Sequence, residues 1–129
     1  MVATEVNGKV IVGGVNGKQL HAINKQTFRK EYKIDNKKLI ASLFKFNDDC
    51  LVVGSYPGLI DVYKVKDTHF ERLSKEEGEI VGGNFYIFNV ISKGNNTYAA
   101  SGYNQGILTF SMNLTNWQGV TPLKQYHPG

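Results

Sequence analysis

The sequence has little cysteine, little proline and no long hydrophobic run. Its 129 residues include one cysteine and three prolines. A single cysteine excludes an intrachain disulfide, and Cys50 begins the apolar run Cys50–Val53, where we expect a buried structural thiol. No apolar run approaches the roughly 20 residues of a membrane-spanning helix, and no signal peptide is recognisable. We therefore expect a cytoplasmic protein without membrane insertion.

Recognisable catalytic and metal-binding patterns are also missing. The three histidines, His21, His69 and His127, lie far apart, and no local His/Cys spacing matches a zinc site. Asp48-Asp49 has the composition of a turn rather than of a catalytic carboxylate pair. Neither a Gly-x-Ser-x-Gly elbow nor a phosphate-binding loop ending in Gly-Lys-Ser/Thr is present. We therefore expect no catalytic residue, no metal and no cofactor, and predict that the protein is not an enzyme.

The charge balance does not indicate a nucleic-acid surface. The formal net charge is +4, from 15 basic and 11 acidic residues. The basic residues occur singly or in pairs such as Lys37-Lys38, and no basic cluster alternates with stacking aromatics. Solvated strand faces account for this pattern, so nucleic acid is not an expected partner.

The segment from Lys38 to Leu73 has the pattern of four consecutive strands. Apolar and polar residues alternate with period two, and no helical periodicity fits better. Asn- and Asp-rich or Gly-containing turns separate the apolar runs. The expected strands are Ala41–Phe46, Cys50–Ser55, Leu59–Lys66 and His69–Leu73. Similar patterns predict further strands on either side of this segment, over 3–6, 9–13, 20–24, 29–34, 97–102, 107–112 and 120–126.

This four-stranded unit resembles a WD repeat. Phe44–Ser55 is similar to the family's F-x-x-D-G turn and L-x-x-G-S strand end, and Gly58–Tyr63 to its D-G-x-I-x-V-W-D strand. Tyr63-Lys64 stands where the family has Trp-Asp, Pro57 stands where it has the Asp before Gly, and the Gly-His start is missing. Residues 16–23 also resemble the quinoprotein-like propeller repeat. The resemblance implies a degenerate WD repeat or a related β-propeller blade.

A Gly-x-x-x-Gly spacing recurs three times, each time between two β-type runs. The first glycines are Gly13, Gly54 and Gly102, so the intervals are 41 residues (13 to 54) and 48 residues (54 to 102). A four-stranded blade typically repeats every 40–45 residues or so. The expected fold is therefore all-β, a partial β-propeller of about three four-stranded antiparallel blades. The blades span about 1–36, 37–75 and 80–127, and Ile80–Ser92 is expected to form the innermost strand of the third.

Three blades leave an open arc, because propellers close with about four to eight blades. We expect an exposed apolar face at each end of the arc, on the units that contain Val10–Val12 and Phe85–Val90. The arc would be completed by a second copy, by further blades of a longer chain, or by other proteins. The expected function is a non-catalytic protein–protein interaction scaffold or a subunit of a larger assembly. The alternative is a fragment of a propeller enzyme or ligand-binding propeller whose site lies on blades outside this chain.

The resemblance also implies a position for the partner surface. In WD-repeat proteins, the loops between the second and third strands share a face that commonly binds other proteins. By position, this face would hold residues that we take as the candidate partner-binding set: Asn16, Tyr56, Pro57, Tyr103, Asn104 and Gln105. Tyrosines are effective interface anchors, but Tyr56 and Tyr103 could equally pack across neighbouring loops. In the same loops, Gly58 is expected to have a positive φ, because the chain must reverse directly after Pro57.

Overall fold

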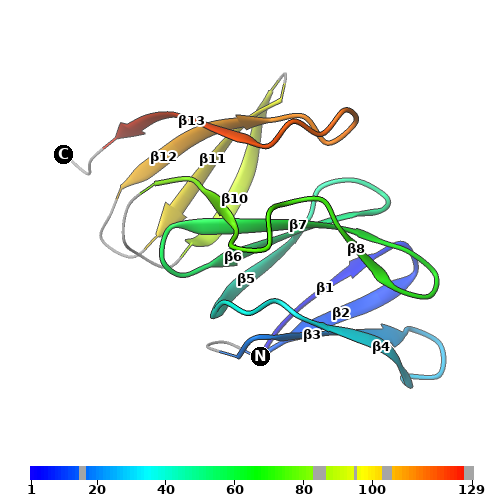
Figure 1. Cartoon of the computed structure of the whole chain (residues 1–129). Coiled ribbons are helices and arrows are strands. Elements are labelled where there is room, and N and C mark those ends of the chain that lie inside the picture. Colours follow the sequence, from blue (N-terminus) through cyan, green and yellow to red (C-terminus); the bar gives the residue numbers. More distant parts are fainter. Residues whose placement is uncertain (15–16, 83–86, 95, 103–105, 127–129) are drawn as a thin grey trace.

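The computed structural model describes residues 1–14, 17–82, 87–94, 96–102 and 106–126 (Figure 1). In this part of the chain there are thirteen β-strands and no helix, and the strands form three antiparallel sheets. The first sheet contains β1 (Val2–Val6), β2 (Lys9–Gly13), β3 (Gln19–Asn24) and β4 (Lys30–Asp35). The middle sheet contains β5 (Ile40–Lys45), β6 (Cys50–Ser55), β7 (Leu59–Val65), β8 (Phe70–Arg72) and β9 (Glu79–Ile80). The third sheet contains β10 (Ile87–Gly94), β11 (Thr97–Gly102), β12 (Ile107–Met112) and β13 (Val120–Tyr126).

The prediction of an all-β chain is confirmed, and most of the predicted strands agree with the structure to within one or two residues at each end. One prediction was wrong. The expected strand Ile80–Ser92 is not continuous, because β9 pairs with β7 in the middle sheet while β10 begins at Ile87. Backbone hydrogen bonding accounts for the difference: the N–H of Val81 donates to the carbonyl of Gly58 at 2.9 Å. This bond holds the chain on the middle sheet after β9.

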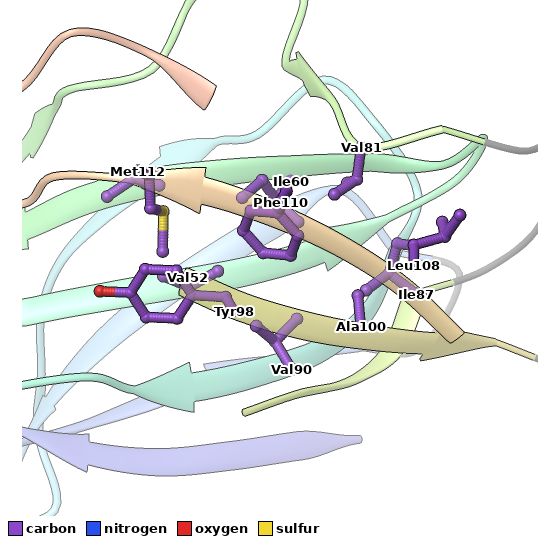
Figure 2. Close-up of a cluster of buried hydrophobic side chains, with 11 residues drawn as sticks. Val52, Ile60, Val81, Ile87, Val90, Tyr98, Ala100, Leu108, Phe110 and Met112 are labelled. Atoms are coloured by element: carbon purple, nitrogen blue, oxygen red, sulfur yellow. The ribbon is translucent and has the colours of Figure 1, made fainter. Parts of the chain in front are cut away.

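The middle sheet lies between the other two and is covered on both faces. Its residues alternate between two apolar clusters, so that Leu51 and Val53 pack with the first sheet while Val52 packs with the third. All six residues of β6 are buried, as expected for a strand with no solvent-facing side. Figure 2 shows the cluster against the third sheet, where aromatic rings of β11 and β12 meet aliphatic side chains of β6 and β7. The two apolar clusters are therefore the two inter-sheet junctions.

The three sheets repeat one order of four antiparallel strands, and the middle and third sheets also share a pairing register. Ile40 pairs with Ser55 in the middle sheet, and Ile87 pairs with Gly102 in the third, with an irregularity directly after each pair. The two sheets are thus related by a shift of 47 residues (40 to 87), not by the 48 of the glycine spacing. Gly102 consequently occupies the position of Ser55 rather than that of Gly54. The alignment of the third Gly-x-x-x-Gly motif was therefore wrong by one residue.

Gly54 lies where the middle and third sheets approach each other closely. A Cβ atom at this position would lie 2.4 Å from the backbone oxygen of Ile87 and 2.3 Å from the Oγ of Ser42. The Ser42 hydroxyl donates a hydrogen bond to that same Ile87 oxygen. A glycine is therefore required here because the next sheet leaves no space for a side chain.

We predict that Gly54→Ala lowers the free energy of unfolding by about 2–3 kcal/mol, because the added methyl group must separate the two sheets. Gly14→Ala is the matched control, since a Cβ at Gly14 meets no atom within 4 Å. Urea denaturation of both variants measures the difference. Equal stability of the Gly54 and Gly14 variants would contradict the close approach.

Candidate functional site

Two of the six predicted partner-binding residues lie in the described part of the chain. Tyr56 and Pro57 form the turn between β6 and β7, where Pro57 is exposed and Tyr56 is half-buried. The N–H of Tyr56 donates to the carbonyl of Leu39 at 3.2 Å, so the turn rests on the segment before β5. Gly58 follows with a φ of 60°, which confirms the predicted positive value. The remaining residues, namely Asn16, Tyr103, Asn104 and Gln105, lie outside the described residues.

A buried polar network links the first and middle sheets. Asn36, which follows β4, has no exposed surface and donates from Nδ2 to the Oγ of Ser55 at 3.3 Å. The hydroxyl of Tyr63 donates to the Oδ1 of Asn36, and burial raises the pKa of this phenol well above its usual range. The backbone N–H of Asn36 donates to the carbonyl of Lys18 at 2.6 Å. The polar groups of Asn36 are thus paired with Ser55, Tyr63 and the backbone of Lys18. This geometry indicates a structural role rather than a catalytic one.

Asp61 is the centre of a second polar group in the middle sheet. Its carboxylate has no exposed surface, and its Oδ1 lies 2.7 Å from Arg72 and 3.3 Å from Lys38. Burial raises the pKa of Asp61, while Lys38 and Arg72 oppose that rise. The Oδ2 atom accepts no hydrogen bond within the described part of the chain. Because Lys38 precedes β5 and Arg72 ends β8, Asp61 fixes both segments against β7.

We predict that Asp61→Asn lowers the free energy of unfolding by about 2 kcal/mol, because two cations lose their counter-charge. The side chains of Arg72 and Lys38 are 17% and 11% exposed, so the loss should be smaller than for a fully buried pair. Glu71→Gln removes only the exposed Lys66–Glu71 pair, at 3.6 Å, and should cost less than about 0.5 kcal/mol. If the two variants unfold at the same urea concentration, the proposed role of Asp61 is wrong.

Cys50 lies at the start of β6 and is 1% exposed, which confirms its predicted burial. Burial raises the pKa of its thiol, and the neighbouring Asp49 carboxylate adds to that rise. A buried thiol with a raised pKa is a poor nucleophile. Among the described residues, no three His, Cys, Asp or Glu side chains lie close enough together to hold a metal ion. These observations describe a structural cysteine.

We predict that a thiol reagent labels Cys50 in the native protein only as fast as local or global opening exposes it. Labelling in urea provides the reference rate for the exposed thiol. A native rate close to the urea rate would contradict the burial of Cys50.

A cleft between the middle and third sheets has a volume of about 570 Å³. Its walls include Leu59 and Ile80 from the middle sheet and Val120 and Pro122 from β13. Glu79 also lines the cleft, and its carboxylate accepts from the N–H groups of Lys75 at 2.8 Å and Val120 at 3.4 Å. Glu79 therefore joins the two sheets at this edge, and its two acceptor oxygens are already engaged.

The outer face of the third sheet is a second candidate surface. Ile91 is 64% exposed, Ile107 is 47% exposed, and Tyr126 is 45% exposed. Ile107 pairs with Tyr126 across β12 and β13, and a shallow groove of about 140 Å³ runs beside Ile91, Ala99 and Ile107. A bare face was expected on this unit, but these residues were not among those predicted to form it. The period-two alternation of Ile107–Met112 would have indicated Ile107, which lies opposite Leu108, Phe110 and Met112.

The first sheet also has an outer face, and it is less exposed. Val10 and Val12 of β2 and Ile23 of β3 lie on it, each half-buried. The charged residues near it include Lys33, which pairs in register with His21, and Glu5, which forms an ion pair with Lys25 at 2.9 Å. Within the described residues, the outer faces of the first and third sheets are thus the two sheet faces that no other sheet covers.

Comparison with known proteins gives a structural match. No family model and no curated protein matches the chain. Its fold is similar to the crystal structure of the computationally designed Ika4 protein, with a TM-score of 0.67 and 13% sequence identity. The match covers 97% of this chain and 72% of the designed protein. Among the described residues, no helix has the length and apolar character needed to cross a membrane.

Proposed function

We propose that the protein is a non-catalytic interaction subunit: a partial propeller of three WD-like blades that joins an assembly through its two uncovered sheet faces. The observation that carries the proposal is that one order of four antiparallel strands repeats in three stacked sheets, while, among the described residues, only the middle sheet is covered on both faces. A cytoplasmic location belongs to the same proposal.

The placement of the first strands supports a propeller-like arrangement. β5 lies against β1 on one side and against β10 on the other, so the first strand of each sheet lies beside the first strand of the next. Blades of a propeller surround a central channel with their innermost strands in the same way. The similarity to the designed protein adds support for this fold alone.

The energetics of the outer faces support an assembly role. Burying a large aliphatic side chain stabilises by about 1.5–3 kcal/mol relative to leaving it exposed. Ile91 and Ile107, more than half and nearly half exposed, would gain a large part of this amount under a covering sheet. The same face carries few charged side chains, and one of them, Lys124, already lies over the Tyr126 ring at 4.9 Å from its centroid. The free-energy cost of removing charges from water when the face is covered is therefore low.

A photo-crosslinking experiment tests the proposed function. The crosslinking amino acid p-benzoylphenylalanine replaces Ile107 in cells that express the protein, and crosslinked products are identified by mass spectrometry. We expect one defined protein product, whether a second copy or another chain. Thr115, exposed in the turn between β12 and β13, is the control position and should give no such product. The absence of any product specific to position 107 would contradict the interaction role.

A further inference from the structure

Each inter-sheet junction has a direction. We define the forward face of a sheet as the face toward the next sheet in chain order, and the back face as the face toward the preceding one. The first junction places the forward residues Ile11 and Leu20 against the back residues Leu51 and Val53. The second places the forward residue Ile60 against apolar back residues of the third sheet. Both junctions therefore join a forward face to a back face.

The two uncovered faces are of opposite kinds. Ile60 is a buried residue of the forward face of the middle sheet, and Ile107 occupies the equivalent position in the third sheet, 47 residues later. The bare face of the third sheet is therefore a forward face. In the first sheet, Val12 pairs with Ala3 as Val53 pairs with Leu43 in the middle sheet, so Val12 occupies a back-face position. One end of the stack therefore offers the face that the other end lacks.

The side chains on these faces suit such a junction. Ile91 and Ala99 on the third sheet and Val10 and Val12 on the first are uncharged and of moderate size. Glu5 lies on β1 in register with Val10, and it is exposed and already paired with Lys25 at 2.9 Å. Lys33 and Lys124 lie on the outermost strands, β4 and β13. Cationic side chains at these positions can stay in water at the rim of an interface.

From these observations, and resting on the proposed function, we propose that the partner is a second copy of this chain, bound head to tail. The forward face of the third sheet of each copy packs on the back face of the first sheet of the other. Closed propellers have about four to eight blades, and the multiple of three in that range is six. Two copies therefore close a six-sheet ring through two identical junctions related by a two-fold axis.

Face-specific variants and their mixture test this arrangement. Ile107→Lys blocks the forward face, and Val12→Glu blocks the back face. In native mass spectrometry and light scattering at micromolar concentration, we expect the wild type at twice the 14.4 kDa chain mass. Each variant alone should dissociate with at least about a tenfold higher Kd, as expected when a charge enters an apolar interface. Mixing the two should yield heterodimers, because one junction then has both faces intact.

A control variant and a second pair of variants distinguish the head-to-tail dimer from misfolding and from other dimer geometries. Phe28→Lys replaces a side chain that is 76% exposed in the turn before β4, away from both faces, and should leave the dimer unchanged. If circular dichroism shows that a variant is unfolded, Ile91→Lys replaces the forward-face variant and Val10→Glu the back-face variant. A face-to-face dimer of third sheets would lose only the Ile107 variant, and the Val12 variant would still form homodimers, which would overturn the head-to-tail proposal.

The head-to-tail dimer and the interaction role can be contradicted separately. A wild-type chain that stays monomeric, or that assembles with a stoichiometry other than two, overturns the head-to-tail dimer. If crosslinks from position 107 then identify another protein, the interaction role stands and only the identity of the partner is wrong. If they identify no protein, the interaction role fails as well.

Discussion

The rest of the structure depends on the burial of the middle sheet from both sides. Because every residue of β6 is buried, neither neighbouring sheet can move away without exposing the apolar side chains of β6 that face it to water. Among the described residues, each of the two clusters combines residues of the middle sheet with residues of only one outer sheet. The orientation of the first sheet relative to the third is therefore set by how each of them packs on the middle sheet.

Buried polar groups set how the sheets meet, since apolar packing alone tolerates small slips. Asn36 joins the link after β4 to Ser55 and Tyr63 of the middle sheet, and Tyr32 of β4 donates to the carbonyl of Lys66. Glu79 performs the corresponding task between the middle sheet and β13. A hydrogen bond of this kind is lost when either partner shifts, so each junction has one favoured register.

Much of the strand layout could be predicted from the sequence because it is local. Alternation and turn residues identified β2, β6, β11, β12 and β13 with the bounds that the structure has. The assignment of Ile80–Ser92 to one strand failed because that segment is divided by a long-range backbone bond to Gly58, which leaves no local signal. Similarly, the shift of Gly102 by one residue follows from pairing with Ile87, which lies outside the motif. The candidate surface depends on which sheet faces stay uncovered. This is decided by how the sheets stack in the folded chain, so no local sequence pattern indicates it.

The polar network of Asn36, Ser55 and Tyr63 has a consequence for how freely the three units could be exchanged. The 47-residue shift places Gly102 and Phe110 at the positions of Ser55 and Tyr63, and neither residue has a hydroxyl group. At the equivalent place the second junction has the ring of Phe110, which stacks on Tyr98 of the same sheet with centroids 5.7 Å apart. The hydrogen bonds that cross the second junction lie elsewhere, at Ser42 and Glu79. The units share a backbone plan but have diverged into distinct parts. A tandem copy of the middle unit would not substitute for the third, and the order of units along the chain is part of the information that the sequence encodes.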